Sequence, residues 1–215
     1  MNKPAIHKEN LKSKKYIVGV TGGIGCGKTT VTNLFAAKGI DIVDADLVAR
    51  DVVMAGSEGL NALVIAFGDT ILSPQNTLNR GALREIVFAD SKAKDKVNGI
   101  LHPLIRQNMM NQLQNTQSHY CILSAPLLFE NNLQQFVDRC LVVDITQSQQ
   151  LERTLGRDGG NANTIKNIMA AQVSREKRLT LANDVIDNSK TQSFLAPQVD
   201  SLHSKYTMLA AQLVT

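Results

Sequence analysis

The sequence predicts an α/β protein built on an open parallel β-sheet of about five strands, flanked by helices. Short continuous apolar runs, typical of strands buried on both faces, alternate with longer segments whose apolar residues recur at helical spacing. The first apolar run ends in a glycine-rich turn that opens a helix, as in a parallel strand–helix–strand unit. With 215 residues, of which 43% are hydrophobic, the chain suits one domain with inserted regions.

The first strand–helix–strand unit is expected within residues 16–43. Residues 16–20 form a short apolar run and are expected to be a buried strand. Residues 29–38 carry apolar side chains at helical spacing, and Gly39 is well placed to end that helix. Residues 40–43 are expected to be the second strand, reached by a right-handed crossover.

A helical insertion is expected at residues 46–118, because this segment is too long for one crossover helix. Its apolar residues recur at helical spacing in three groups: Leu60, Leu63, Val64 and Phe67; Leu83, Ile86 and Val87; and Leu101, Leu104 and Ile105. His102 precedes Pro103 and is expected either to begin a helix or to contact a substrate.

The rest of the chain is expected to complete the sheet and to cover it with a lid. Strands are expected at residues 120–123, 141–143 and 185–186, and a closing helix at 192–213. A helix starting at residues 151–155 should break at the glycine-rich turn 156–161, whose flexible residues suit a mobile cover. The resulting single domain over residues 16–215 has a core at 16–45, 119–152 and 182–215, the insertion at 46–118 and the lid at 153–181.

Charge and composition narrow the expected partners. Residues 1–15 hold five lysines and one glutamate, so this tail accounts for the whole net charge of +4 and the rest is formally neutral. We expect the tail to be disordered and expect no nucleic-acid partner. No apolar run reaches the roughly 20 residues of a membrane helix and no secretory signal is visible, so we expect no membrane partner and a cytoplasmic location. Three cysteines at no metal-ligand spacing indicate no disulfide framework, and the oligomeric state stays open.

A phosphate-binding loop is indicated by residues 22–29, Gly-Gly-Ile-Gly-Cys-Gly-Lys-Thr, which match the P-loop pattern in full. The glycines let the backbone wrap closely around an anion at the start of the next helix. Lys28 is expected to reach the β- and γ-phosphates, Thr29 to bind Mg²⁺ and Thr30 to touch the α-phosphate. The sequence therefore predicts a P-loop NTPase-type sheet that binds ATP or a close relative with Mg²⁺ through Gly23, Gly25, Cys26, Gly27, Lys28, Thr29 and Thr30.

The thiol of Cys26 admits two interpretations. A cysteine at a helix N-terminus can have a lowered pKa and become reactive. The alternative, which we favour, is a small side chain that merely fits the loop.

Four acids follow the predicted strands, at the edge where a parallel sheet places its active site. We assign the role of catalytic base to Asp46, while Asp44 could hold Mg²⁺ through water or cap the next helix. Glu130 is expected to face the same crevice, with a surface position as the alternative. Asp144 could face the crevice or cap a helix.

Two arginines, Arg153 and Arg157, flank the end of the helix before the glycine-rich turn. On a mobile cover they could stabilise the negative charge that phosphoryl transfer spreads over the γ-phosphate oxygens. The alternative is a solvated helix face, since arginines are favoured near helix C-termini.

In order and spacing, these pieces resemble the dephospho-coenzyme A kinase family from about Tyr16 to the C-terminal helix. The resemblance rests on residues 20–31, 43–50, 101–105, 126–130 and 141–144, on Arg153 with Arg157 and Asp158, and on residues 171–172 and 185–188. Members of that family transfer the γ-phosphoryl group of ATP to the ribose 3′-hydroxyl of dephospho-CoA, the last step of CoA synthesis.

The resemblance implies roles for individual residues. Asp46 matches the proposed base, and Arg153 and Arg157 match the lid region. Dephospho-CoA should lie across the inserted helices, between His102, Arg106 and the loop that ends at Glu130. Four positions depart from the family pattern: Cys26 and Thr29 stand where serine is commoner, Ser124 lies two places before Pro126 where an acid is frequent, and Asn183 stands where aspartate is frequent.

Two other functions stay open on the residues alone. A different P-loop kinase could act on a nucleotide, nucleoside or small alcohol. A nucleotide-dependent switch is the non-enzymatic alternative, but the chain holds no Asn-Lys-x-Asp motif of the kind that reads guanine in GTPases.

Overall fold

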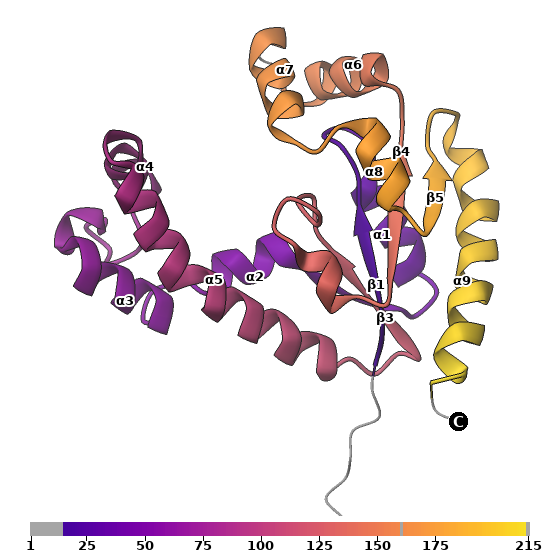
Figure 1. Cartoon of the computed structure of the whole chain (residues 1–215), viewed down its shortest axis with the longest axis horizontal. Coiled ribbons are helices and arrows are strands. Elements are labelled where there is room, and N and C mark those ends of the chain that lie inside the picture. Colours follow the sequence, from indigo (N-terminus) through magenta and orange to yellow (C-terminus); the bar gives the residue numbers. More distant parts are fainter. Residues whose placement is uncertain (1–14, 160, 214–215) are drawn as a thin grey trace, which may run out of the picture.

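The computed structural model describes residues 15–159 and 161–213, in which five strands form one parallel sheet of order β2-β3-β1-β4-β5. The strands are β1 (Tyr16–Thr21), β2 (Asp41–Asp44), β3 (Tyr120–Ser124), β4 (Arg139–Asp144) and β5 (Asp184–Asp187). Because all five run in the same direction, their carboxyl ends meet at one edge, the upper edge in Figure 1. The predicted open parallel α/β sheet is confirmed.

Helices cover both faces of the sheet and extend beyond it (Figure 1). They are α1 (Lys28–Ala36), α2 (Ala45–Asp51), α3 (Glu58–Phe67), α4 (Arg80–Ala89), α5 (Ser91–Gln114), α6 (Gln147–Asp158), α7 (Ala162–Ala171), α8 (Arg175–Leu181) and α9 (Leu195–Ala211). Short 3-10 turns lie at Asp69–Ile71, Leu133–Phe136 and Gln192–Phe194.

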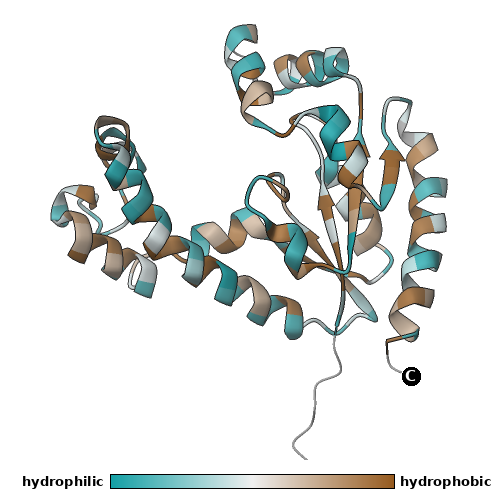
Figure 2. Ribbon diagram, viewed as in Figure 1, coloured by the Kyte–Doolittle hydropathy of each residue, from teal (hydrophilic) through white to brown (hydrophobic). Residues whose placement is uncertain are grey.

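The hydrophobic core has one layer on each face of the sheet, and Figure 2 shows the hydrophobic strands between them. Alternate residues of a strand point to opposite faces, so Val18 of β1 packs with α1 and α9 whereas Ile17 packs on the other side. Helix α5 covers that second face with Met109 and Leu113, both fully buried. Burial on both faces explains why the strands are continuous apolar runs.

Helices α3, α4 and the first half of α5 project away from the sheet (Figure 1) and have a hydrophobic cluster of their own. Its buried members are Val53, Leu63, Ile71 and Leu83. Because α5 packs into this cluster at one end and onto the sheet at the other, it joins the projecting helices to the core. The boundaries expected for the insertion and the lid remain predictions.

One expected helix start is wrong, and so is one of the two alternatives for His102. Helix α5 begins at Ser91, capped by the side chain of Asp90, and continues through Pro103, so His102 lies in the middle of a helix. Helix α6 begins at Gln147 rather than near residue 151, because Thr146 and Gln149 form a reciprocal capping box.

Other features agree with or lie outside the expectations. Among the described residues, no helix is both long and apolar enough to cross a membrane. The three cysteines are free and buried. The expected tail falls outside the described residues except for Lys15, whose Nζ donates a hydrogen bond to the Ser118 carbonyl (2.6 Å).

Candidate active site

The phosphate loop connects the carboxyl end of β1 to α1 at the centre of the sheet. Gly27 precedes α1 with φ +84°, a backbone conformation that favours glycine, and no side chain caps this helix in the described structure. The first amides of a helix have no intrahelical acceptor, so those of α1 are available to an anion. The loop therefore has the geometry that phosphate binding requires.

Three amide side chains hold the loop, of which Gln172 and Asn188 lie in segments that carry the family resemblance and Gln150 was not singled out in the sequence. Gln150 of α6 donates to the Ile24 carbonyl (3.1 Å), and Gln172, after α7, accepts from the Ile24 amide (3.0 Å). Asn188 donates to the Cys26 carbonyl (2.7 Å). A side chain at Gly23 would collide with the end of the Gln150 side chain, which would have to shift from its present position.

The Cys26 thiol points into the protein. It is 3% exposed, and burial raises its pKa, an effect larger than the opposing influence of a hydrogen bond from the Lys28 amide. The thiol is therefore protonated at neutral pH, which contradicts the reactive interpretation and supports the small-residue one.

Asp44 links the phosphate loop to α2. One carboxylate oxygen caps α2, accepting from the amides of Asp46 (2.9 Å) and Leu47 (3.3 Å). The other accepts from the Ser124 hydroxyl (3.1 Å) and lies 3.8 Å from Lys28 Nζ. Both roles left open for Asp44 are compatible with this position, since it caps a helix and also borders the loop.

Two cavities meet at Asp46. A cavity of about 770 Å³ is lined by the phosphate loop together with Asp44, Asp46, Pro126, Arg153, Arg157, Ile168 and Gln172. A smaller one of about 120 Å³ is lined by Asp46, His102 and Arg106, by the neighbouring Ala125 and Pro126, and by residues of α2, α5 and the segment after β3. Asp46 and Pro126 line both, so a group bound in either cavity can approach the Asp46 carboxylate.

Most of the predicted site residues are thus brought together, and Glu130 is the exception. Arg153 and Arg157 line the larger cavity, and Arg153 also donates to the Asn188 carbonyl (3.0 Å). Glu130 lines neither of the two cavities, and its carboxylate accepts from the Val173 amide (2.8 Å). The structure therefore places Glu130 as a support for the segment between α7 and α8, not in the crevice where we expected it.

Comparison with known proteins identifies the family. A sequence model of dephospho-CoA kinases matches residues 16–193. A curated dephospho-CoA kinase of Vibrio cholerae is 49% identical over 92% of this chain and 98% of its own length, and one of Sodalis glossinidius is 47% identical over 92% and 95%. The chain belongs to the dephospho-CoA kinase family. Rival P-loop kinase families and the switch hypothesis gain no support from these matches.

Solved structures share the fold of this family member. A crystal structure from Thermus thermophilus has a TM-score of 0.77 at 25% identity and covers 89% of this chain and 97% of its own. Dephospho-CoA kinase from Campylobacter jejuni has a TM-score of 0.69 at 23% identity, covering 91% and 98%. The overall fold, across about nine tenths of the chain, is therefore shared with these structures.

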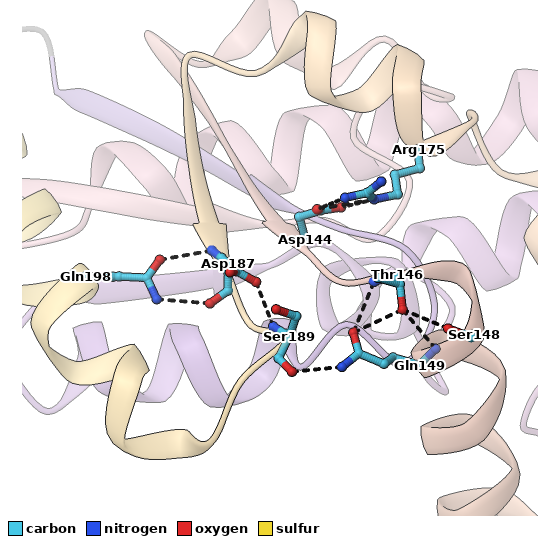
Figure 3. Close-up of polar contacts among 8 residues, drawn as sticks. All are labelled: Asp144, Thr146, Ser148, Gln149, Arg175, Asp187, Ser189 and Gln198. Atoms are coloured by element: carbon cyan, nitrogen blue, oxygen red, sulfur yellow. Dashed lines mark hydrogen bonds and ion pairs between the residues drawn. The ribbon is translucent and has the colours of Figure 1, made fainter.

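In this dephospho-CoA kinase family member, an ion pair anchors the start of α8 to the sheet (Figure 3). Arg175 donates Nε and Nη2 to the two carboxylate oxygens of Asp144 (2.9 and 2.6 Å) at the end of β4. Asp144 does not cap α6, because Thr146 does. The capping residue Gln149 also donates to the Ser189 carbonyl (2.8 Å), which ties α6 to the loop after β5.

The phosphate-loop cavity offers oxygen ligands for a metal ion. No group of three or more His, Cys, Asp or Glu side chains suited to a metal occurs in the described part of the chain. Thr29 and Asp44 line the cavity and offer the hard oxygen atoms that Mg²⁺ prefers. A donor set this small fits Mg²⁺ bound with substrate phosphates and water, and does not fit a metal caged by the protein alone.

Proposed function

We propose that the protein transfers the γ-phosphoryl group of ATP to the ribose 3′-hydroxyl of dephospho-CoA, giving CoA and ADP in the last step of CoA biosynthesis. The observation that carries this proposal is that Asp46 lines both the phosphate-loop cavity and the adjoining pocket of His102 and Arg106. A donor on the loop and an acceptor in that pocket would then meet at one carboxylate.

ATP is assigned to the phosphate loop. The amides of residues 25–30 and the uncapped start of α1 would hold the phosphates, and Lys28 would reach the β- and γ-phosphates. Thr29 and, through water, Asp44 would hold Mg²⁺. When bound there, Mg²⁺ would neutralise charge that develops on the phosphate oxygens.

Asp46 is assigned to the acceptor. Its carboxylate would orient the attacking hydroxyl and accept its proton, as an acid at this position can do in phosphoryl transfer. The Asp44 cap on the amides of Asp46 and Leu47 supports this role, because it fixes the first turn of α2 beside Lys28. His102 and Arg106, one turn apart on α5, would contact dephospho-CoA.

Arg153 and Arg157 are assigned to the transferred phosphoryl group. Both line the phosphate-loop cavity from α6, and residues 153–181 would close as a lid that excludes water. Gln150, just before that segment, and Gln172, within it, both hold the Ile24 peptide, which would couple the lid to the loop. We place the reaction in the cytoplasm, which three free buried cysteines suit.

The test is a coupled assay of ADP release from ATP and Mg²⁺, with and without dephospho-CoA. We expect ADP formation that depends on dephospho-CoA and a product heavier by one phosphoryl group. Folded protein that binds ATP but forms no acceptor-dependent ADP would exclude the proposed reaction. The Lys28→Met variant is the matched control for contaminating kinases and should lose the activity.

A further inference from the structure

A buried hydroxyl separates the two charged groups of the phosphate site. Ser124, the last residue of β3, is 1% exposed. Its Oγ accepts from Lys28 Nζ (2.5 Å) and donates to Asp44 Oδ2 (3.1 Å). The three side chains come from α1, β3 and the end of β2, so this contact forms only in the folded sheet.

The hydrogen-bonding capacity of serine explains the arrangement. A hydroxyl has one hydrogen to donate, and Ser124 gives it to the carboxylate, which leaves its lone pairs to face the ammonium group. Serine therefore satisfies an anion on one side and a cation on the other without adding a charge of its own.

The distance between Lys28 Nζ and the Asp44 carboxylate matters because it is slightly too long for a hydrogen bond between them. Their charged atoms lie 3.8 Å apart, whereas a charge-assisted N–H···O hydrogen bond is about 2.7–2.9 Å long. An ammonium in direct contact with a carboxylate would have to leave it before meeting a phosphate. One held by a neutral hydroxyl gives up a weaker partner.

We propose that Ser124 is a positioning residue that keeps Lys28 from a direct hydrogen bond to the Asp44 carboxylate, 3.8 Å away, and so keeps its ammonium group available to the triphosphate. The inference rests on the proposed binding of ATP at the loop. It does not depend on the acceptor, so a failed kinase assay and a failed positioning test can be told apart.

Removing the Ser124 hydroxyl should weaken ATP binding. In Ser124→Ala, Lys28 and Asp44 are free to close the remaining distance, and the closer pair competes with ATP. With the water screening expected for a pair whose carboxylate side chain is 30% exposed, shortening the pair by about 1 Å weakens Mg²⁺-free ATP binding roughly twofold. With ATP saturating, kcat should stay within about twofold, so the effect falls on the KM for ATP.

The experiment is calorimetric titration of the full chain with ATP in EDTA, for the wild type, Ser124→Ala and Ser124→Thr. Ser118→Ala is the matched control. It removes a partly buried hydroxyl, bonded to the Asp41 amide and the Tyr120 carbonyl near the opposite end of β3. We expect ATP affinity to fall roughly twofold in Ser124→Ala and to stay unchanged within the error of the titration in Ser118→Ala. Ser124→Thr keeps the hydroxyl and should remain near the wild type.

A double substitution tests whether the effect passes through the ion pair. In an Asp44→Asn background no carboxylate remains to capture Lys28, so adding Ser124→Ala should leave ATP affinity unchanged within the error of the titration. Unchanged or tighter ATP binding in folded Ser124→Ala would overturn the proposal. An equal loss with and without the Asp44 carboxylate would overturn it as well.

Discussion

Replacing Asp44 by Asn separates the two tasks of this carboxylate. Asparagine caps a helix as well as aspartate does, so the hydrogen bonds to the amides of Asp46 and Leu47 can persist. The negative charge that faces Lys28 disappears. Asp44→Ala removes both the cap and the charge, which makes it the comparison variant.

The magnitudes follow from the geometry. Two unit charges 3.8 Å apart attract by about 4 kcal/mol at an effective dielectric constant of about 20. The Asp44 side chain is 30% exposed, so water screens the pair and leaves a net value of about 1 kcal/mol. In Asp44→Asn, Mg²⁺-free ATP affinity should therefore rise up to about fivefold. Loss of the cap in Asp44→Ala should cost roughly 1 kcal/mol more stability than Asp44→Asn.

Urea unfolding gives the two stabilities, and calorimetric titration in EDTA gives ATP affinity. Turnover should fall in Asp44→Asn, although ATP affinity rises. The variant should also need a higher Mg²⁺ concentration, because Asp44 is proposed to hold the ion through water. The reasoning fails if Asp44→Asn binds Mg²⁺-free ATP several-fold more weakly than the wild type. It fails also if the Asn and Ala variants have the same stability.

Three further predictions concern other sites. Asp46→Asn should lower kcat by at least about 100-fold with ATP affinity nearly unchanged, measured by ADP release and titration, because it loses a general base. Native Cys26 should resist iodoacetamide at pH 8, followed by mass spectrometry, because burial raises its pKa. Asp184→Asn should lower the free energy of unfolding in urea by roughly 3 kcal/mol, because it leaves the charged side chains of Arg139 and Lys205 without the carboxylate that binds them.

The Asp184 prediction includes a pH dependence. Burial tends to raise the pKa of Asp184, but hydrogen bonds from Arg139 and Lys205 outweigh it, so the pKa is lowered on folding. The carboxylate therefore stabilises the fold fully above its unfolded pKa of about 3.9, and this contribution is lost as pH falls through the lower folded value. Wild-type stability should fall below about pH 4, and the variant should fall less steeply. If the wild type and Asp184→Asn lose stability equally steeply below about pH 4, this explanation is wrong.

Two controls complete the set. Urea-unfolded protein should react with iodoacetamide at all three cysteines, and rapid labelling of Cys26 in the native state would contradict its buried position. If Asp46→Asn keeps near-normal turnover, Asp46 is not the catalytic base.

The sheet and the phosphate loop could be predicted because their signals are local. A buried parallel strand is a continuous apolar run, and the loop needs glycines and Lys28 at fixed spacing. The start of α6 was missed because its signal is the capping pair of Thr146 and Gln149, not its apolar residues. Helix α5 continues through Pro103, because packing at both ends of the helix outweighs one lost hydrogen bond, and this excludes His102 as a helix start.

The supports of the site could not be predicted because they connect distant parts of the chain. Gln150, Gln172 and Asn188 hold loop peptides more than 120 positions away, and an amide side chain carries no pattern that announces such a partner. Glu130 was expected at the crevice from its place after a strand, yet its partner is the Val173 amide. Ser124 was noted as a departure from the family pattern, and only the fold shows it between Lys28 and Asp44.

The most direct test of the central claim compares two acceptor analogues, 2′-deoxy- and 3′-deoxy-dephospho-CoA, in the ADP-release assay with the product mass determined. The account predicts that the 2′-deoxy analogue gains one phosphoryl group and that the 3′-deoxy analogue gains none while still competing with dephospho-CoA. Phosphorylation of the 3′-deoxy analogue, or of neither dephospho-CoA nor its 2′-deoxy analogue by protein that binds ATP, would contradict it.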